Sequence, residues 1–370
     1  MSVDANNFVP ALSRSFSPAI VNWQKAYGRN SLPWQNTRDP YCVWLSEIML
    51  QQTQVGTVLV YYAKFLQRFP AVADLAAAQL DEVLGLWSGL GYYSRARNMH
   101  RCAQQIMALH AGVFPANAMQ LQTLPGIGPS TAAAIASFCF AERVAILDGN
   151  VKRVLTRVLA FSGDLAQGAQ ERQLWCLATA LLPTQDLAET MPRYTQGLMD
   201  LGATVCTLRK PLCIKCPVQT VCHGFMAGEP DKYPIKTRKL KRSAQKLSLL
   251  WAQRPDGSVW LERRPISGIW GGLYCLPVFD SDEELKAFLP VQLHSRMESL
   301  TPFKHVLTHK DLHLSPVIAG FLADQQMPVK APADLGVKEP EVVGAWFSAS
   351  QWTALGLPAP VRKLLQDEAR

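Results

Sequence analysis

Apolar side chains recur at helical spacing through residues 19–225, and this pattern predicts a domain built almost entirely of helices. The clearest stretches are residues 43–69, 81–110, 130–140 and 151–161. Prolines and glycines separate these stretches, as helix breakers do. No internal repeat of about 20–50 residues is present, so the sequence does not predict a solenoid or a propeller.

The spacing changes in the last third of the chain. Residues 247–251 alternate apolar and other side chains, residues 255–257 predict a turn, and the alternation resumes at Val259, which is typical of a β-hairpin. Two patches of helical spacing follow, at residues 282–289 and 350–369. We therefore expect a separate mixed α+β domain over residues 245–366.

Two further segments frame these domains. Residues 1–18 are polar and predict a flexible leader, so the helical domain is expected over residues 19–230, with a cysteine-rich module at 195–225. Residues 231–244 are expected to form an exposed linker. From Asp231 to Lys246 the chain carries seven basic residues and one acidic residue, a charge that could lie along a phosphate backbone or serve a solvated hinge.

Composition excludes several classes of protein. The 370 residues are 48% hydrophobic and only 18% charged, which argues against a largely disordered chain. No run of about 18 apolar residues is present and the leader lacks a signal-peptide core, so we expect a cytoplasmic protein without a membrane partner. The net charge of +8 favours a polyanionic partner.

Four of the nine cysteines are close together, namely Cys206, Cys213, Cys216 and Cys222. In a reducing compartment such a group indicates a metal site rather than disulfides. Zinc sites with four cysteines usually use two CxxC pairs, and this segment has one, so an iron–sulfur cluster is favoured and zinc is the alternative. Basic residues between the cysteines suggest that the loop is positioned on nucleic acid.

The stretch LPGIGPST at residues 124–131 predicts a tight turn that opens a helix. Gly126 and Gly128 would let backbone N–H groups approach an anion, and the helix N-terminus adds positive potential. An ordinary helix-to-helix turn is the alternative. The context looks like a helix–hairpin–helix, which grips a phosphate without reading sequence.

Two carboxylates are candidates for chemistry. Glu47 lies in a strongly apolar helical stretch, where burial would favour its protonated form, and Gln51 and Gln54 are expected on the same helical face. Asp148 precedes a helix that begins near Val151 and is suited to cap it, which is the simple alternative to a catalytic role. A polar stripe on a surface helix is the corresponding alternative for Glu47.

Aromatic residues beside arginines form a further group. Trp34 in LPWQ at residues 32–35, and the stretch GLGYYSRAR at residues 89–97, combine base-stacking side chains with cations that suit phosphate contact. Burial of Trp34 and Tyr93 in the core is the alternative interpretation.

Together these stretches resemble the MutY family of A/G-specific adenine DNA glycosylases, within the helix–hairpin–helix glycosylase superfamily. The matching stretches are residues 32–35, 44–54, 89–97, 124–131 and 147–153 and the four cysteines. The resemblance implies a mainly α N-terminal glycosylase domain with an iron–sulfur module holding a [4Fe–4S] cluster, and an α+β Nudix-like C-terminal domain. It also implies a monomer that removes adenine from double-stranded DNA with A:8-oxoG or A:G mispairs.

The resemblance also implies roles for single residues. Glu47 would protonate N7 of adenine and later help deprotonate water, Asp148 would stabilise the oxocarbenium-like sugar, and Asn150 would position groups nearby. The expected DNA-binding residues are Gln52, Thr53, Tyr92, Arg95, Gly126, Gly128 and Ser130, of which Tyr92 and Gln52 would fill the base stack. Thr308 and His309 would recognise the lesion.

The sequence departs from family patterns at two points. Lyase-type relatives carry a Schiff-base lysine at the position of Ser130, so we expect a monofunctional enzyme without strong strand cleavage. The C-terminal domain has Leu307, Thr308 and His309 where family members often have Phe-Ser-His, and it lacks the Nudix hydrolase signature. His305 and His313 flank this turn, where hydrogen bonding or exposure is the expected role and a metal trio is the alternative.

The sequence leaves two other functions as alternatives. One is a non-catalytic DNA-binding protein whose cluster senses redox state, which predicts no product from A:8-oxoG duplexes. The other is a pyrimidine-directed glycosylase-lyase, which predicts an adduct trapped by borohydride, and Ser130 argues against it.

Overall fold

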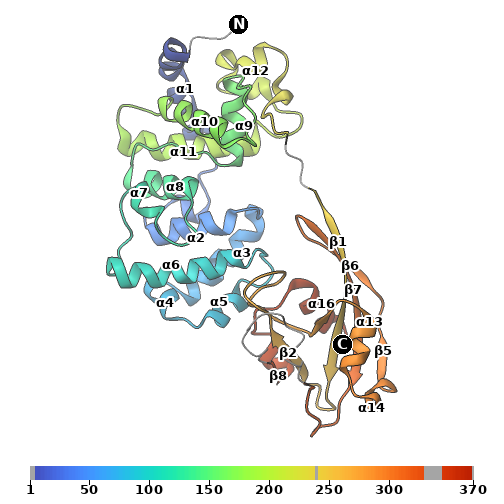
Figure 1. Cartoon of the computed structure of the whole chain (residues 1–370). Coiled ribbons are helices and arrows are strands. Elements are labelled where there is room, and N and C mark those ends of the chain that lie inside the picture. Colours follow the sequence, from blue (N-terminus) through green and yellow to red (C-terminus); the bar gives the residue numbers. More distant parts are fainter. Residues whose placement is uncertain (1–4, 238–240, 329–343, 369–370) are drawn as a thin grey trace. The chain divides into compact units, whose positions relative to one another are not determined.

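The computed structural model describes residues 5–237, 241–328 and 344–368 (Figure 1). The chain divides into two compact units, Met1–Ala76 with Arg101–Lys239, and Ala77–His100 with Leu240–Arg370. Within the described ranges, every helix is too short or too polar to cross a lipid bilayer.

The first unit is helical. Its elements are α1 (Ala5–Tyr27), η1 (Pro33–Gln35), α2 (Pro40–Leu50), α3 (Val55–Arg68), α4 (Val72–Ala77), the end of α6 (Ser94–His110), α7 (Ala118–Leu121), α8 (Pro129–Phe140), α9 (Gly149–Val158), α10 (Gly168–Ala180), α11 (Leu187–Thr204), η2 (Cys213–Lys215), η3 (Gln219–Val221), α12 (His223–Met226) and η4 (Pro230–Lys232).

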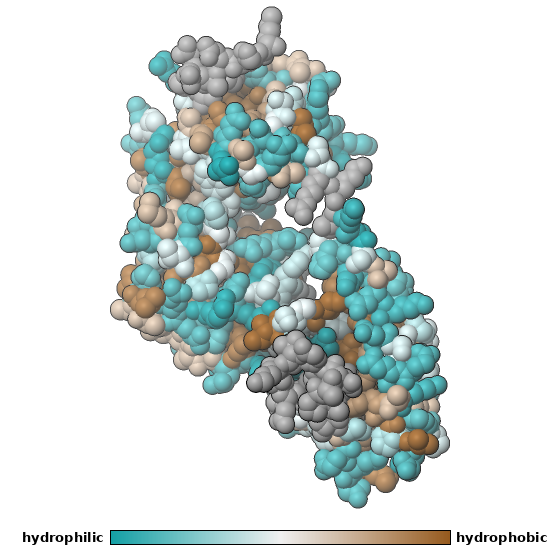
Figure 2. Space-filling view, in the orientation of Figure 1, coloured by the Kyte–Doolittle hydropathy of each residue, from teal (hydrophilic) through white to brown (hydrophobic). Residues whose placement is uncertain are grey.

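Helix α11 is central to this unit. It packs against α1, α8 and α9, and α8 packs in turn against α2 (Figure 1). Phe16, Ile20, Val154 and Leu198 are among the fully or almost fully buried side chains of the shared core. On the visible face of the unit, hydrophilic side chains are mixed with neutral and hydrophobic ones (Figure 2). The helices that carry the candidate site residues are therefore fixed by burial of their apolar faces.

The expected flexible leader is wrong over most of its length. Residues 1–4 lie outside the described residues, but α1 begins at Ala5 and continues to Tyr27. Leu12 and Phe16 are 5% and 0% exposed, because their side chains join the core that α1 shares with α11. Apolar residues spaced four apart in a polar segment were the signal for this helix.

Two predicted long helices are each divided. Within residues 43–69, one helix ends at Leu50 and the next begins at Val55. Gln52, between the two helices, has a backbone φ of 56°. Gln51 and Gln54 therefore flank the break and do not share a helical face with Glu47. The stretch 81–110 breaks over residues 87–93, where positive φ values interrupt the helical backbone.

Among the residues that the structure describes, the second unit contains a mixed eight-stranded sheet. Its strands are β1 (Ser243–Gln253), β2 (Val259–Arg263), β3 (Tyr274–Cys275), β4 (Val278–Phe279), β5 (Met297–Ser299), β6 (Phe303–Val306), β7 (Lys310–Gly320) and β8 (Gly344–Phe347). Its helices are α5 (Leu80–Leu86), the start of α6, α13 (Asp282–Phe288), α14 (Val291–His294), α15 (Ala349–Trp352) and α16 (Ala359–Glu368).

Strand β1 is the middle of this sheet. It pairs antiparallel with β2 next to the turn at residues 255–257, which confirms the predicted hairpin. On its other side it pairs in parallel with β7 from Ser243↔Lys310 to Gln253↔Gly320. Leu249 and Leu250 point into separate cores on opposite faces, because successive strand residues alternate. Strand β1 is thus buried on both faces.

Part of the expected linker is bound to the first unit. The backbone N–H of Leu165 donates to Ile235 at 3.1 Å, and the backbone N–H of Thr237 donates to Asp164 at 3.2 Å. Ile235 and Thr237 are therefore hydrogen bonded to the first unit, while Asp231, Lys232, Lys236 and Thr237 are exposed, as expected for the linker. Residues 238–240 of the expected linker lie outside the described residues.

Candidate active site and cysteine centre

Helix α2 presents Glu47 to a cavity. The Asp39 side chain caps the helix by accepting from the Tyr41 N–H at 2.9 Å, and Pro40 occupies its first turn. Most of the other residues of the helix are buried and apolar, among them Trp44 and Ile48. Glu47 is only partly buried, because its side chain lines the cavity.

The surroundings of Glu47 favour its protonated form. Loss of solvent around the carboxyl, and to a lesser degree the negative charge of Asp148, together raise the pKa of Glu47 to about 8. The predicted perturbation of Glu47 by its apolar surroundings is present in the structure. The two carboxyl groups are close enough to interact electrostatically, although Asp148 does not line the cavity.

Asp148 caps α9, as the sequence predicted. Its carboxylate accepts from the Val151 N–H at 2.7 Å. Burial raises the pKa of Asp148, while hydrogen bonds from the backbone of Val151 and Asn150, and the charge of Arg153, act in the opposite direction. Capping orients the carboxylate but does not use all of its acceptor sites, so both the structural and the chemical interpretations of Asp148 fit this geometry.

The turn that carries Asp148 and Asn150 is joined to the cysteine segment. Arg153 donates to Asn150 Oδ1 at 2.9 Å, to the Gly202 carbonyl at 2.6 Å and to the Cys206 carbonyl at 2.7 Å. A Cβ atom at Gly202 would lie 2.6 Å from the Cβ of Asn150, so only glycine permits α11 to pass this close to the turn. Asn150 is thus held from two sides.

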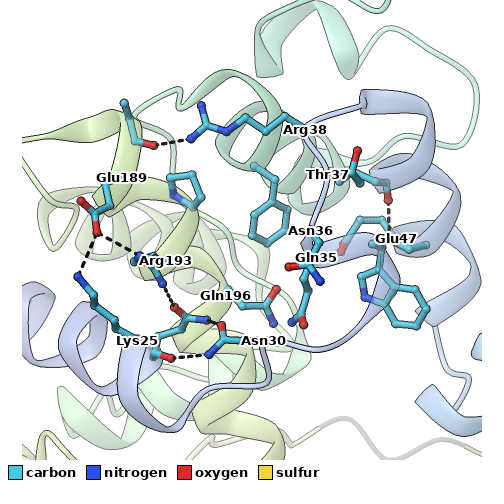
Figure 3. Close-up of a pocket in the computed structure, with 17 residues that line it drawn as sticks. Lys25, Asn30, Gln35, Asn36, Thr37, Arg38, Glu47, Glu189, Arg193 and Gln196 are labelled. Carbon is cyan, nitrogen blue, oxygen red and sulfur yellow. Dashed lines mark hydrogen bonds and ion pairs between the residues drawn. The ribbon is translucent and has the colours of Figure 1, made fainter.

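The cavity beside Glu47 encloses about 620 Å³ (Figure 3). It is bounded by α1, η1, α2, α8 and α11. Its lining residues are Gln24, Lys25, Asn30, Trp34, Gln35, Asn36, Thr37, Arg38, Val43, Ser46, Glu47, Phe138, Ala188, Glu189, Pro192, Arg193 and Gln196. The indole of Trp34 and the amides provide an apolar surface together with hydrogen-bonding groups, which is typical of a small-molecule pocket.

Gln196 is a site residue that the sequence analysis missed. Its Nε2 donates to Asp200 at 2.9 Å, and Asp200 is fully buried and also accepts from the Arg29 Nε at 2.7 Å and the Arg29 backbone N–H at 2.9 Å. The buried carboxylate fixes the orientation of the Gln196 amide, so Oε1 is the end that can accept from a ligand. Only the helical i, i+4 spacing of Gln196 and Asp200 signalled this pair, and that spacing is common.

Gln35 gives the cavity wall a second amide. Its Oε1 accepts from the Leu32 N–H at 3.1 Å. Its Nε2 is buried and has no hydrogen-bond partner in the part of the chain that the structure describes. A buried donor without a partner is costly and uncommon, and such groups gather where a ligand completes the hydrogen bonding.

The segment after α2 adjoins the hairpin helix. Gln51 Nε2 donates to Thr131 Oγ1 at 3.4 Å, which connects the end of α2 with the first turn of α8. Gln52 is exposed and held in the left-handed backbone region, and Thr53 is partly exposed. The residues expected to touch DNA at the lesion are therefore presented at the C-terminal end of α2.

The hairpin has the expected form. Helix α7 packs against α8, and Leu124 and Ile127 are buried while Gly126 and Gly128 are exposed between them. Gly126 has φ of 78°, which favours glycine, whereas Gly128 is the N-cap of α8 with ordinary extended backbone. Ser130 is partly exposed in the first turn of α8. The exposed glycines leave the helix N-terminus open to an anion.

The four clustered cysteines meet at one place. Cys206, Cys213, Cys216 and Cys222 line a single small cavity of about 20 Å³, and all four are in the reduced form rather than in disulfides. Among the described residues, no group of three or more His, Cys, Asp or Glu side chains is arranged to hold a single metal ion. The structure therefore places the four predicted thiols around one cavity but does not show them in a metal-binding arrangement.

A buried arginine holds this cysteine segment. Arg157 is 2% exposed, and its guanidinium donates to the carbonyl of Thr207 at 2.7 Å and of Pro230 at 2.9 Å. It also donates to the Cys206 sulfur at 3.3 Å. Further acceptors are the carbonyls of Leu208 and Tyr233 and the carboxylate of Asp231. The side chain thus joins both ends of the cysteine segment to α9.

In the second unit, Tyr92 and Thr308 lie together. The hydroxyls of Tyr92 and Thr308 are hydrogen bonded, and both residues line a cavity of about 760 Å³ with His305 and His309. Tyr92 is 43% exposed and has φ of 49°, so its ring is presented by an unusual backbone. The structure thus brings together the expected stacking tyrosine and the expected lesion-recognition residues.

Arg95 does not have the expected role in phosphate contact. It is 9% exposed and donates to the carbonyls of Leu90 and Gly91 at 3.1 Å each. Its guanidinium also lies 5.2 Å from the Trp87 ring and 5.5 Å from the Tyr92 ring. Burial lowers the pKa of Arg95 to about 10. Arg95 therefore supports the loop that presents Tyr92.

The alternative of a histidine metal trio is not supported. His305 is half-buried and its ring lies 6.3 Å from that of Trp270, and burial lowers the pKa of this imidazole. His313 is exposed on β7. Within the described ranges, these histidines are not part of any group of three or more side chains arranged to hold a metal ion.

Two family models match the chain, one in its helical part and one in the part that forms the sheet. The model for the HhH-GPD superfamily of base excision DNA repair proteins matches residues 45–178, and the model for the NUDIX domain matches residues 249–367. These matches confirm the predicted helix–hairpin–helix glycosylase domain and the predicted Nudix-like α+β domain.

Relatives extend over nearly the whole chain. The adenine DNA glycosylase of Buchnera aphidicola subsp. Acyrthosiphon pisum is 36% identical over 95% of this chain and 97% of its own. The human adenine DNA glycosylase is 32% identical over 85% of this chain and 68% of its own. A solved structure of a thermostable thymine-DNA glycosylase is similar with a TM-score of 0.52 and 28% identity, covering 60% of this chain and 100% of that one. At this identity and coverage the chain belongs to the adenine DNA glycosylase family, and it is a DNA glycosylase.

Proposed function

We propose that this chain is a monofunctional adenine DNA glycosylase that hydrolyses the N-glycosidic bond of adenine opposite 8-oxoguanine or guanine, acting as a monomer on duplex DNA. The observation that carries the proposal is Glu47, a carboxyl in a cavity wall whose pKa is raised to about 8. Such a group is protonated at neutral pH and can act as a general acid.

Proton donation by Glu47 begins the reaction. Adenine is extruded from the duplex into the cavity, because its glycosidic bond is not accessible inside the base stack. Protonated Glu47 donates to N7, which makes the neutral base a better leaving group. The C1′–N9 bond breaks with its electron pair going to adenine, and the sugar is left as an oxocarbenium-like cation.

Asp148 stabilises that cation. Its carboxylate is held by the Val151 N–H and is close enough to Glu47 to influence its pKa, so both act on one bound nucleotide. A fixed negative charge is more effective than mobile water at a developing positive charge. Asn150, held by Arg153, positions groups beside it. Glu47, now ionised, accepts a proton from the water that adds to the sugar.

Gln196 supplies selectivity for adenine in this proposal. Asp200 occupies the amide Nε2, so Oε1 is available as an acceptor on the cavity side. The exocyclic amine of adenine is a donor, whereas guanine presents a carbonyl at the same position. An acceptor held in place therefore favours adenine, since a mismatched polar pair would leave buried groups unpaired.

The DNA contacts follow the exposed features of the first unit. The N-terminus of α8 at Gly126 and Gly128 would bind a backbone phosphate through peptide N–H groups. Gln52 and Thr53 would contact the base pair at the lesion. Ser130 cannot form a Schiff base, so the reaction ends at the abasic site.

In the second unit, Tyr92, Thr308 and His309 would recognise the base opposite adenine. They share one cavity, and Tyr92 and Thr308 are joined by a hydrogen bond. The exposed ring of Tyr92 suits stacking in an opened duplex, and the hydroxyl and imidazole suit hydrogen bonding to the altered base edge. This unit would recognise the lesion without hydrolysing pyrophosphate.

Cys206, Cys213, Cys216 and Cys222 would hold a [4Fe–4S] cluster. All four cysteines line one cavity, which supports a shared ligand, and the single CxxC spacing favours the cluster over zinc. When bound, the cluster would supply a rigid cross-link for the loop that carries Arg209, Lys210 and Lys215. Iron and sulfide analysis, together with visible absorbance, tests this assignment directly.

One assay tests the proposed function. Labelled duplexes carrying A:8-oxoG, A:G and an oxidised pyrimidine are incubated with excess protein, and strand breaks are scored with and without alkali. We expect alkali-dependent breaks at adenine in the first two duplexes only. A borohydride-trapped adduct with the pyrimidine duplex would favour the lyase alternative, and binding without any product would favour the non-catalytic alternative.

Replacing Asp148 with asparagine is expected to slow adenine excision by about 10²-fold. The amide keeps an oxygen that can accept from Val151 and so can still cap α9, but it lacks the charge that opposes the cation. Single-turnover kinetics on the A:8-oxoG duplex measure the effect, and circular dichroism checks the helix content. A variant as fast as the parent would contradict the role of Asp148.

A further inference from the structure

The loop at residues 87–93 presents Tyr92 on an unusual backbone. Gly89 and Gly91 have φ of 107° and 71°, and Tyr92 has φ of 49°. A left-handed backbone is unfavourable for a tyrosine, and it persists only where the surrounding contacts determine it. The position of the Tyr92 ring therefore depends on what holds the rest of the loop.

One set of contacts comes from the loop and the start of α6. The Trp87 Nε1–H and the Arg95 guanidinium donate to the Gly91 carbonyl at 3.0 and 3.1 Å. Because these residues belong to one short stretch of chain, the bonds fix the shape of the loop. They do not fix its position relative to Thr308, which lies between β6 and β7 and is 216 residues from Tyr92.

A second set of contacts comes from residues 353–357, which precede α16. The Tyr93 hydroxyl donates to the Leu357 carbonyl at 2.8 Å. The backbone N–H of Tyr274, in β3 of the sheet, donates to the Gly356 carbonyl at 3.0 Å. Residues 353–357 are thus hydrogen bonded both to the loop and to the sheet, and they connect the two.

A single arginine on α16 holds residues 353–357 against the loop. The Arg362 guanidinium donates to the Thr353 carbonyl at 2.9 Å and to the Leu355 carbonyl at 2.6 Å. Its Nε donates to Ser88 Oγ at 2.9 Å. A planar guanidinium presents its donors in a fixed geometry, so these three acceptors are held in one arrangement.

The loop is bound on both sides of Tyr92. Ser88 Oγ donates to the Leu357 carbonyl at 3.4 Å, and the Tyr93 hydroxyl donates to the same carbonyl. In the described part of the chain, Arg362 and Ser88 are not among the residues that line the cavity shared by Tyr92 and Thr308. Arg362 can therefore influence that cavity only through the loop.

We propose that Arg362 is a positioning residue for recognition of the base opposite adenine. By holding residues 353–357 against Ser88, it places the loop so that the Tyr92 hydroxyl meets Thr308 and the Tyr92 ring is presented to that base. The proposal rests on the proposed function, in which Tyr92 and Thr308 recognise the lesion. Part of the selectivity for the lesion then depends on a residue outside the cavity.

Equilibrium binding to two duplexes tests the proposal. Each duplex carries a non-hydrolysable adenosine analogue, opposite 8-oxoguanine in one and guanine in the other, and the ratio of the two dissociation constants gives the preference for 8-oxoguanine. Arg362→Met keeps a long apolar side chain and removes the donors. We expect the preference to fall about fivefold, because the loop no longer holds Tyr92 beside Thr308.

Lys363→Met is the matched control. Lys363 is the exposed neighbour of Arg362 on α16, so its replacement removes the same charge, and its preference should equal that of the parent. Ser88→Ala removes the other end of the hydrogen bond and leaves Arg362 in place. It should lower the preference by about twofold, and it carries the test if Arg362→Met does not fold.

A Tyr92→Ala background shows whether Arg362 acts through the tyrosine. Thr308 and His309 remain in this variant, and adding Arg362→Met should not change its remaining preference, because both changes remove the same interaction. An unchanged preference in Arg362→Met or Ser88→Ala would overturn the proposal. So would an equal loss of affinity for both duplexes, or a further fall in the Tyr92→Ala background. A parent without any preference would instead refute the proposed lesion recognition.

Discussion

Replacing Glu47 with glutamine is expected to reduce adenine excision by at least about 10³-fold while leaving duplex binding within about twofold of the parent. The amide has nearly the same size as the carboxyl and fits the same cavity wall, so α2 should keep its packing. It has no acidic proton to give to the leaving base, and after bond cleavage it cannot accept a proton from water.

Single-turnover excision from an A:8-oxoG duplex measures the rate, and equilibrium binding to a duplex with a non-hydrolysable adenosine analogue measures affinity. Glu283→Gln is the control, because Glu283 is an exposed carboxylate on α13. Its rate should equal that of the parent. Single-turnover excision by Glu47→Gln at the parent's rate would remove Glu47 from the mechanism.

The same residue should set the basic side of the pH–rate profile. Glu47 acts in its protonated form, and its pKa is raised to about 8, so excision should be fast below this pH and fall as pH rises through it. Asp148 acts in its ionised form, so the rate should also fall at low pH, and the profile should be bell-shaped. A flat profile between pH 6 and about 9 would contradict general-acid catalysis by Glu47.

Local patterns predicted the surroundings of single side chains better than they predicted contacts between distant parts of the chain. A carboxylate within an apolar helical stretch indicated a perturbed Glu47, and this needs only the residues next to it in α2. The position of Asp148 before α9 likewise indicated a cap, which the structure contains. Both features depend on contacts within a few residues along the chain, where sequence spacing and spatial proximity coincide.

The contacts of Gln196 and Arg95 could not be predicted from sequence spacing. Gln196 is oriented by Asp200, which in turn is fixed by Arg29, and no pattern relates a buried aspartate to an arginine 171 residues away. Arg95 was expected to contact a phosphate because it lies beside aromatic residues. An arginine in such a stretch can contact DNA, but it can equally donate hydrogen bonds to carbonyls of its own loop. The choice between these depends on the path of the loop at residues 89–93, which positive φ values determine.

The predicted helix boundaries were wrong for a related reason. Apolar spacing continues from residue 43 to 69, and the break at 51–54 contains neither glycine nor proline. Tertiary contacts there, including the hydrogen bond from Gln51 to Thr131, replace helical ones. The sequence also did not predict the parallel pairing of β1 with β7. About sixty residues separate the two strands, and alternation of apolar residues indicates a strand without indicating its partner.

Replacing Arg157 with methionine is expected to lower the free energy of unfolding of the first unit by at least about 3 kcal/mol. The guanidinium is almost fully buried, and it satisfies carbonyls from both ends of the cysteine segment as well as the Cys206 sulfur. Methionine fills much of the space but donates no hydrogen bonds, so several buried acceptors would lose their partners at once. If the cysteines hold a cluster, iron content per chain should fall in parallel, because the loop that fixes Cys206 loosens.

Arg172→Met is the control for this prediction, since Arg172 is exposed on α10 and its loss should change the stability by less than about 0.5 kcal/mol. Urea unfolding followed by the helical signal measures both variants, and iron analysis accompanies each. A destabilised Arg157→Met protein with full iron content would separate the packing role of the arginine from cluster retention. An unfolding curve equal to that of the parent would mean that the carbonyls around Arg157 find water instead, and that the cysteine segment is held by its thiols and not by the arginine.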